Sequence, residues 1–305
     1  MNSAVKKAPH VIPYQGSKRK LAADILSYMD FNIETLYEPF VGSGAITLAA
    51  AANSKAQNFV IADKLEPLAE LWRLIIENPN KLAAEYASYW NGQLEDPANY
   101  FKEIREEYNK TRSPSILLYL IARCVKNAVR FNSNGDFNQS PDNRRLGMKP
   151  DKVQREAHLI SKLLKGKVII QSCDFRESIA NAGPNDLVYM DPPWQGTSGK
   201  KDSRYAYLLD LNELIVELEV LNNRSVPYML SFDGTCGDKT YGTELPSYLE
   251  LYRVGLNAGR SSQATLLGRD DITIESLYLS PALMKKTKNQ EINKDKIQPS
   301  LLELF

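Results

Sequence analysis

The chain has 305 residues, of which 43% are hydrophobic and 25% are charged, and its formal net charge is +1. This composition is typical of a globular protein with a sizeable core, and there is no run of about 18 apolar residues that would predict a membrane-spanning helix. Three scattered cysteines and two histidines argue against a disulfide framework, a metal site and a Ser-His-Asp triad. The amino-terminal residues lack the apolar stretch of a signal peptide, so we expect a cytoplasmic protein with no membrane association.

The amino-terminal part alternates helical and strand-like patterns. Its predicted elements are a helix over 18–29, a strand over 35–40, a helix over 45–52, a strand over 59–62 and a helix over 65–77. This alternation predicts a parallel sheet with right-handed crossovers. It is interrupted by helical stretches near 80–93, 97–109 and 114–129, and then by a predicted loop or tight hairpin over 131–150, which is rich in Asn, Gly, Pro and Asp.

Alternation resumes after this interruption. The predicted elements are strands over 168–172 and 186–190, a helix over 211–221, and strands over 228–232, 249–254 and 272–279. We therefore predict an α/β fold in which a Rossmann-like sheet with helices on both faces is formed by 1–78 and 166–283. Residues 79–165 would form an inserted helical and hairpin domain, and the polar residues 284–305 a flexible tail.

Positive charge is concentrated within the predicted insert. Residues 109–155 contain ten Lys or Arg and three Asp, so the rest of the chain is net acidic. A basic segment of this kind favours contact with phosphate groups, although a solvated helix face can have the same composition.

A glycine loop follows the strand predicted over 35–40. The segment Glu38-Pro39-Phe40-Val41-Gly42-Ser43-Gly44 contains two glycines that permit a tight turn and close approach to a ligand. Asp63 stands nineteen residues after Gly44, at the end of the next predicted strand, where a carboxylate can accept hydrogen bonds from ribose hydroxyls. The pair indicates a cofactor that contains a nucleoside, either NAD or S-adenosylmethionine. Asp63 by itself is also compatible with a helix N-cap.

A second motif, Asp191-Pro192-Pro193-Trp194, directly follows the strand predicted over 186–190. Prolines fix their own φ angle, so the carbonyl groups of this turn are presented rigidly. If Asp191 and the Pro192 carbonyl each accept one N–H of an exocyclic base amine, the nitrogen lone pair becomes free to attack an electrophilic methyl group. Trp194 offers a flat face for a base that has left its stack. The motif therefore favours methyl transfer, and it has no use in hydride transfer by NAD.

These motifs, in this order, resemble those of the Dam-type, D12-class DNA adenine-N6 methyltransferases over residues 10–280. The matching segments are 13–18 (cofactor motif), 38–44 (glycine loop), Asp63 (ribose-binding acid), 130–138 (start of the DNA-reading hairpin), 173–175 (contact to the cofactor adenine) and 191–194 (catalytic tetrapeptide). The family most often has Tyr in place of Trp194 and commonly Trp in place of Tyr14, and both exchanges retain an aromatic face. The spelling Asp-Pro-Pro-Trp also occurs in RNA adenine methyltransferases.

The resemblance implies S-adenosylmethionine as the cofactor. Lys18 would neutralise its methionine carboxylate, Tyr14 would pack beside it, and Asp174 and Phe175 would contact its adenine. The implied cofactor-binding residues are Tyr14, Lys18, Glu38, Pro39, Phe40, Gly42, Gly44, Asp63, Asp174, Phe175 and Asp191. The implied catalytic residues are Asp191, Pro192, Pro193 and Trp194. Because the sulfonium already activates the methyl group, no metal ion is needed.

The resemblance also implies the reaction, which is site-specific methyl transfer to N6 of an adenine flipped out of double-stranded DNA. Residues 79–165 would then form the target-recognition domain. The side chains expected to contact base edges are Arg130, Asn132, Asn138, Arg144 and Arg145. Three alternatives stay open: adenine methylation of RNA, methylation of cytosine N4, and a catalytically silent relative that binds DNA. Cytosine-N4 enzymes more often have Ser in place of Asp191, which disfavours the second alternative.

The carboxyl end suggests a further partner. Gln298, Leu301, Leu304 and Phe305 have a spacing that resembles the tail peptides that dock on DNA sliding clamps, although such a tail can also pack on its own domain. A companion restriction endonuclease is compatible with the family. Base flipping at one site needs no second subunit, so we expect a monomer.

Overall fold

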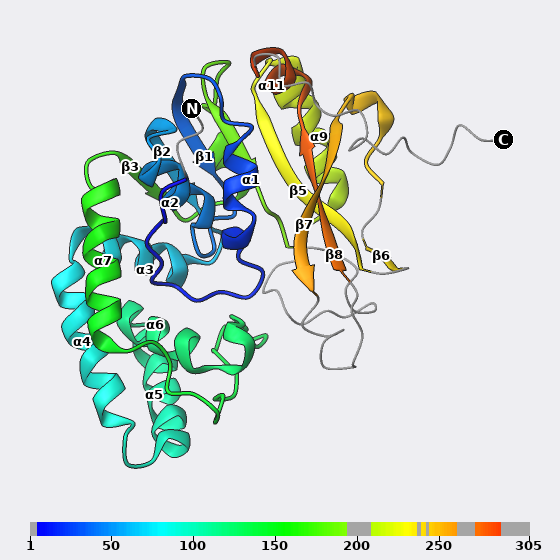
Figure 1. Cartoon of the computed structure of the whole chain (residues 1–305). Helices are drawn as coiled ribbons and strands as arrows, with labels where there is room; N and C mark the ends of the chain where they lie inside the picture. The colour runs from blue at the N-terminus through cyan, green and yellow to red at the C-terminus, as the bar shows by residue number, and fades with distance from the viewer. Residues whose placement is uncertain (1–4, 194–208, 237–238, 242–243, 261–271, 288–305) are drawn as a thin grey trace.

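The computed structural model describes residues 5–193, 209–236, 239–241, 244–260 and 272–287 (Figure 1). Trp194 of the predicted catalytic motif lies outside these ranges, as do the four residues of the predicted clamp-binding tail, Gln298, Leu301, Leu304 and Phe305. Within the described ranges, no helix combines the length and the apolar character that a membrane span needs.

A central sheet organises the fold. Its strands are β1 (Ile33–Glu38), β2 (Ala56–Ala62), β3 (Val168–Gln171), β4 (Leu187–Met190), β5 (Tyr228–Cys236), β6 (Lys239–Tyr241), β7 (Tyr252–Arg260) and β8 (Ile272–Leu279). They lie in the order β3-β2-β1-β4-β5-β8-β7, and β6 pairs with β5. The part from β3 to β5 is parallel, whereas β8 is antiparallel to both β5 and β7. The predicted parallel sheet and its closing strand pair are confirmed.

The strand order fixes where a ligand can bind. The chain passes from β1 to β2 and β3 on one side, and later fills β4 and β5 on the other side. Tyr37 of β1 accordingly lies opposite both Val60 of β2 and Val188 of β4. In open α/β sheets, ligands bind at the carboxyl ends of the strands that flank such a reversal. The ends of β1 and β4 are therefore the expected place for the site.

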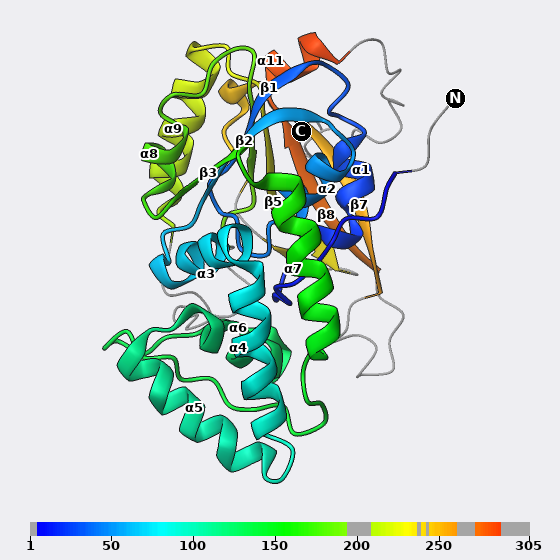
Figure 2. The ribbon, with the colours of Figure 1, turned by 90° about the vertical axis from the view of Figure 1, so that its left-hand side faces the viewer.

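Helices cover both faces of the sheet, with α1 and α2 on the side opposite α8 and α9 (Figure 2). Successive side chains of a strand point to opposite faces. Leu36 belongs to the apolar cluster that includes α1 (Ala22–Leu26), α2 (Ala45–Ala52) and α3 (Glu66–Glu77). Its neighbour Tyr37 belongs to the cluster that includes α8 (Phe175–Ile179) and α9 (Leu211–Asn223). The predicted α/β class with helices on both faces is confirmed.

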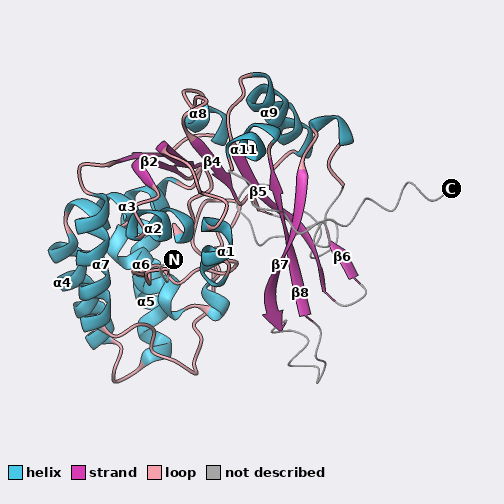
Figure 3. Cartoon of the chain, turned by 45° about the horizontal axis from the view of Figure 1, so that its top comes forward, coloured by secondary structure: helices cyan, strands magenta, loops and turns pink. Residues whose placement is uncertain are grey.

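Four further helices gather at one end of the molecule, away from β5, β7 and β8 (Figure 3). They are α4 (Pro79–Gly92), α5 (Pro97–Thr111), α6 (Pro114–Arg123) and α7 (Pro150–Leu164). α6 is at the centre of this group: it contacts α3, α4 and α5, and its residues from Ser115 to Arg123 are all buried. Because α7 packs on α2, α3 and α4, the loop between α6 and α7 is anchored at both ends.

The element boundaries agree with the sequence in most places, and α2 has the predicted bounds. The prediction lacks α8, and it lacks α7, whose buried face is formed by Val153, Ala157, Ile160 and Leu164. It also extends α6 too far, because a 3-10 turn (Val125–Asn127) with Lys126 at φ 60° follows the helix.

The predicted loop over 131–150 and the predicted tail over 284–305 can be compared with the structure where residues are described. Between 131 and 149 the structure has no helix and only isolated bridges, as expected of a loop or tight hairpin. Helix α11 (Pro281–Lys286) follows β8 and occupies the first three residues of the predicted tail 284–305. Short 3-10 turns at Lys18–Lys20 (η1) and Ser247–Leu249 (η3) complete the described elements.

Candidate active site

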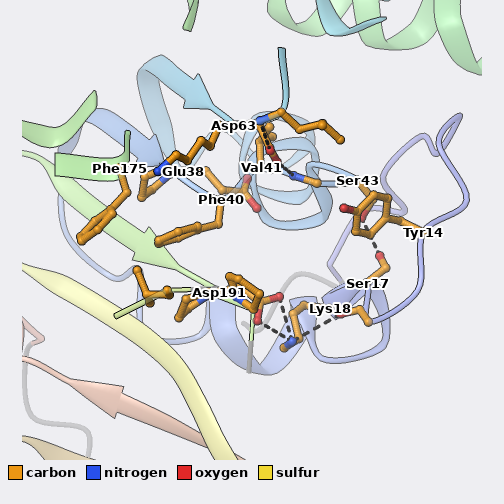
Figure 4. A pocket seen from close by; sticks show the side chains of 18 of the residues that line it. Tyr14, Ser17, Lys18, Glu38, Phe40, Val41, Ser43, Asp63, Phe175 and Asp191 are labelled. Atoms are coloured by element: carbon orange, nitrogen blue, oxygen red, sulfur yellow. Dashed lines mark hydrogen bonds and ion pairs between the residues drawn. The ribbon is translucent and has the colours of Figure 1, made fainter. Parts of the chain in front are cut away.

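A pocket of about 390 Å³ opens where the parallel strands end (Figure 4). Glu38 is the last residue of β1, and carboxylates that follow β2, β3 and β4 also reach the pocket. The predicted residues that line it are Tyr14, Lys18, Glu38, Pro39, Phe40, Gly42, Asp63, Asp174, Phe175, Asp191, Pro192 and Pro193. Gly44 is the one predicted cofactor-binding or catalytic residue within the described ranges that does not line it. The structure thus brings together segments that are far apart in the sequence.

The glycine loop between β1 and α2 is shaped by two left-handed residues. Gly42 has φ +45°, and a Cβ there would lie 3.4 Å from the ring of Tyr14, so the loop packs closely on the amino-terminal motif. Gly44 has φ +60°, and a Cβ there would lie 2.6 Å from the buried ring of Trp72. The cofactor contact predicted for Gly44 stays a prediction. This glycine makes room for Trp72, whose Nε1 donates a hydrogen bond to the carbonyl oxygen of Gly42 (3.1 Å).

Asp63 is held in place by two backbone amides. Its Oδ2 accepts a hydrogen bond from the N–H of Gly42 (3.2 Å), and its Oδ1 accepts one from the N–H of Leu65 (3.0 Å). The N-cap position of α3 belongs to Leu65, so Asp63 is not the N-cap that its sequence position also allowed. Burial raises the pKa of Asp63 to about 6. A further hydrogen-bond donor that enters the pocket would therefore favour the ionised carboxylate.

Asp174 and Phe175 lie on the side of the pocket next to α8. The ring of Phe175 stacks on the ring of Phe40, with 5.3 Å between the centroids. Asp174 is the N-cap of α8 and accepts hydrogen bonds from the backbone N–H (3.2 Å) and Nε (2.8 Å) of Arg176. Burial acts to raise the pKa of Asp174, but the hydrogen bonds and charge of Arg176 hold it below its usual value. The aspartate is thus both a helix cap and a group that faces the pocket.

Asp191 meets a lysine from the amino-terminal motif (Figure 4). The Nζ atom of Lys18 is 2.7 Å from Oδ1 and 2.8 Å from Oδ2 of Asp191, and 3.3 Å from the carbonyl oxygen of Gly16. It also forms a longer ion pair of 3.5 Å with Oε2 of Glu275. The resemblance implies that Lys18 meets the methionine carboxylate of a cofactor, whereas in this structure its ammonium donates hydrogen bonds to Asp191.

Negative charge predominates at this end of the pocket. Glu38 is buried and accepts a hydrogen bond from the backbone N–H of Thr47 (2.9 Å). Burial raises the pKa of Glu38 to about 8, and the charge of Asp191 acts in the same direction. Burial and the charge of Glu275 raise the pKa of Asp191, whereas Lys18 lowers it. Glu38 lies within electrostatic range of Asp191, and Asp191 and Glu275 both pair with Lys18. This excess of carboxyl groups favours a ligand that carries positive charge.

The comparison with known families agrees with this arrangement. The family model for D12 class N6 adenine-specific DNA methyltransferases matches residues 14–245, which include the glycine loop, Asp63, Asp174 and Asp191. The chain belongs to this family. The resemblance drawn from the ordered motifs is confirmed.

Three relatives illustrate the similarity. The DNA adenine methylase of Escherichia coli (strain K12) is 24% identical over 243 residues, which cover 74% of this chain and 81% of the relative. The DNA adenine methylase of Serratia marcescens is 25% identical over 195 residues, which cover 62% of this chain and 68% of the relative. The type II methyltransferase M.FokI of Planomicrobium okeanokoites is 26% identical over 240 residues, or 75% of this chain. The match spans only 36% of the length of M.FokI.

Some residues at the site of this D12-class chain are not evident from the sequence. The hydroxyl groups of Ser17 and Ser43 are hydrogen-bonded (2.8 Å) and join the amino-terminal motif to the glycine loop. Val129 lines the pocket from the segment that follows α6, and Glu275 lines it from β8. The signal for Glu275 is a charged residue on the same face of β8 as the buried Leu277 and Leu279. Alternation alone does not reveal that it reaches the pocket.

The five predicted DNA-reading residues lie in the segment between α6 and α7, but their surroundings differ. Oδ1 of Asn132 accepts hydrogen bonds from the backbone N–H groups of Asn134 (2.9 Å) and Asp136 (2.8 Å), so this side chain shapes the turn. Nε of Arg130 is buried and has no hydrogen-bond partner among the described residues. Asn138 is exposed.

Arg144 and Arg145 share one anchor. Nε of Arg144 and Nε of Arg145 each donate to a different carboxylate oxygen of Asp142 (both 3.0 Å). The Asp142 side chain is 5% exposed, whereas that of Arg144 is 85% exposed. The Asp142 carboxylate thus holds both arginines, and the exposed side chain of Arg144 remains accessible to a ligand.

Proposed function

We propose that this chain is a site-specific DNA methyltransferase that transfers a methyl group from S-adenosylmethionine to N6 of adenine in double-stranded DNA. The observation that carries the proposal is the position of Asp191, which directly follows β4 and lines the same pocket as the glycine loop and Asp63. The family membership of the chain supports the same reaction. A base that enters next to Asp191 would meet an acceptor for its amine and a neighbouring space for a nucleoside cofactor.

The lining residues fit S-adenosylmethionine. Asp63 would accept hydrogen bonds from the ribose hydroxyls, and the stacked rings of Phe40 and Phe175 would pack on the adenine. Glu38, whose pKa burial raises to about 8, would regain a favourable charged form beside the methionine ammonium. When bound, the cofactor supplies an electrophilic methyl group on a cationic sulfonium. The net negative charge of the carboxylates favours this cation over an uncharged product.

Catalysis would depend on positioning and on hydrogen bonds to the substrate amine. The carboxylate of Asp191 would accept one N–H, and the rigid carbonyl group of Pro192 would accept the other. Both bonds draw the nitrogen toward tetrahedral geometry and free its lone pair. The proton that the methylated amine loses would pass to solvent. Trp194 would provide a stacking face for the flipped base.

We also propose that 79–165 form the target-recognition domain beside a catalytic domain of 1–78 and 166–283. The excess of basic residues over 109–155 and the exposed guanidinium of Arg144 suit DNA phosphates and base edges. Val129 lies at the pocket, so the same segment would connect target reading with the site of methyl transfer.

The test is a methyl-transfer assay with labelled S-adenosylmethionine. Unmethylated double-stranded DNA and an RNA pool are offered separately, and the products are identified by nucleoside mass spectrometry. We expect N6-methyladenine in DNA with the wild-type protein and none with Asp191→Ala. N4-methylcytosine or label in RNA would overturn the substrate and keep the chemistry. Cofactor binding without transfer would favour a silent DNA-binding relative.

Further proposals concern partners and location. We propose a cytoplasmic monomer and a companion restriction endonuclease, the latter because one relative is named a type II methyltransferase. We also propose that Gln298, Leu301, Leu304 and Phe305 dock on a sliding clamp. Deletion of the last eight residues should then abolish binding to a purified clamp. Unchanged binding would refute the docking proposal.

A further inference from the structure

The ammonium group of Lys18 lies between two carboxylates. Its Nζ is 2.7 and 2.8 Å from the oxygens of Asp191, and 3.5 Å from Oε2 of Glu275. The side chains of Lys18, Asp191 and Glu275 are 8%, 20% and 22% exposed, and all three line the pocket. The ammonium thus has a close partner on one side and a second carboxylate just beyond hydrogen-bond distance on the other.

Glu275 is an unusual residue for its position. It lies in β8 opposite Gly234 of β5 and Leu256 of β7. It points to the same face of the sheet as Leu277 and Leu279, which belong to the buried apolar cluster. Its Oε2 is buried and has no hydrogen-bond partner among the described residues. A buried charged oxygen without a hydrogen bond costs free energy, so packing alone does not account for a glutamate here.

The proposed reaction offers a role for the carboxylate of Glu275. Asp191 has to accept an N–H of the substrate amine, but both of its oxygens already accept from Lys18. An ammonium bound to a carboxylate stabilises its charge and weakens it as an acceptor. Charge-assisted N–H···O bonds form at about 2.7–2.9 Å. Lys18 therefore needs to shift by less than about 1 Å to bond Glu275 instead.

We propose that Glu275 is a positioning residue that takes over the Lys18 ammonium when the adenine amine binds Asp191. The inference rests on the proposed function. Before substrate binds, Lys18 orients and neutralises Asp191. In the substrate complex the ammonium moves onto Glu275, and the carboxylate of Asp191 accepts from the amine. Glu275 does not touch the substrate, so its effect reaches the reaction through Lys18.

The first test is Glu275→Gln, which keeps the size of the side chain and removes its charge. We expect the single-turnover rate of methyl transfer to unmethylated genomic DNA to fall by about 10- to 100-fold, the effect of one charge-assisted hydrogen bond. The Kd of S-adenosylmethionine should change far less than the rate, because the carboxyl groups of Glu38 and Asp191 remain in the pocket. The matched control is Glu34→Gln, which removes the same charge at an exposed position in β1 outside the pocket. This control should retain the wild-type rate.

The pH dependence gives a readout that a purely structural role would not move. The charged or titratable groups around Asp191 are Lys18, Glu38, Tyr189 and Glu275. Because the negative charge of Glu275 raises the pKa of Asp191, Glu275→Gln should lower it. The acid limb of the single-turnover rate should therefore move to lower pH. Loss of packing would lower the rate at every pH and leave the limb in place.

A double-mutant cycle with Lys18→Met decides whether Glu275 acts through Lys18. If it does, Glu275→Gln should cost no further rate once the ammonium is gone. Additive losses would overturn the inference, as would a wild-type rate for Glu275→Gln in a protein that does methylate adenine. Glu275→Asp, which restores the charge, should recover part of the rate, and circular dichroism checks that each variant is folded. A wild-type protein that transfers no methyl group to adenine would instead overturn the proposed function, and this inference with it.

Discussion

Replacement of Gly44 by alanine tests how the glycine loop is built. Gly44 has φ +60°, and a Cβ there would lie 2.6 and 2.8 Å from ring atoms Cζ2 and Cη2 of Trp72. A left-handed backbone costs a residue with a Cβ about 1–2 kcal/mol. Displacement of a buried ring from a close-packed core costs a further ~1–3 kcal/mol. We therefore expect Gly44→Ala to lower the free energy of unfolding by about 2–5 kcal/mol, against the roughly 5–15 kcal/mol of a typical domain.

Gly166→Ala is the matched control, because it changes the backbone term alone. Gly166 has φ +78°, and no atom lies within 4 Å of its Cβ position. Gly166→Ala should lower the free energy of unfolding by only about 1–2 kcal/mol. Urea unfolding followed by circular dichroism measures both variants, and the difference between them isolates the contact with Trp72. Since Trp72 also donates to the Gly42 carbonyl, Gly44→Ala should bind S-adenosylmethionine more weakly, whereas Gly166→Ala should not.

Equal losses in the two variants would refute this explanation, because they would mean that Trp72 moves aside without cost. Trp72→Phe makes the test stricter. Phenylalanine lacks the two ring atoms that a Cβ at position 44 would meet. The double variant Gly44→Ala, Trp72→Phe should therefore be more stable than the sum of the single changes implies. Strictly additive losses would show that the two residues do not interact.

Three other outcomes follow from the charges at the site and in the insert. Burial raises the pKa of Glu38 to about 8, so folding takes up a proton and stability should fall as pH rises from about 4.5 to 8; Glu38→Gln should flatten this slope in urea titrations. Asp63→Asn should raise the cofactor Kd by about 10- to 100-fold in calorimetry; an unchanged Kd would exclude the ribose contact. Asp142→Ala should reduce discrimination between target and random DNA about tenfold in fluorescence anisotropy, because Arg144 and Arg145 lose their shared anchor; an unchanged ratio would mean that neither arginine reads bases.

The parts of the site that could be predicted are those that depend on local pattern and strand order. Glu38, Asp63 and Asp191 each close or follow an apolar strand. Parallel strands place their carboxyl ends at one edge of the sheet, so their convergence followed from the sequence. Helix α2 is predictable because its eight residues are all small or apolar, which is typical of a helix that packs closely against a sheet. Helix α7 is hard to predict because its first turns belong to the basic segment 109–155 and its buried face has only four positions.

The parts that could not be predicted are contacts between distant segments. Lys18 and Asp191 are 173 residues apart, and no pattern along the chain shows whether this ammonium meets a cofactor or a catalytic carboxylate. Gly44 has the spacing of a ligand-binding glycine, and only the buried ring of Trp72 reveals its packing role. Such contacts depend on side-chain direction in three dimensions, which periodicity does not encode.

The basic segment shows why a charge count is not a contact map. Arg123 is one of its ten basic residues, but it is fully buried. Its guanidinium donates hydrogen bonds to the backbone carbonyl groups of Asp142 (2.8 Å) and Arg145. Arg123 therefore holds the backbone of the loop that carries Arg144, and the Asp142 carboxylate holds the Arg144 side chain. A loop that is ordered before it meets DNA loses less conformational entropy on binding, so Arg123 can strengthen DNA binding without reaching a phosphate.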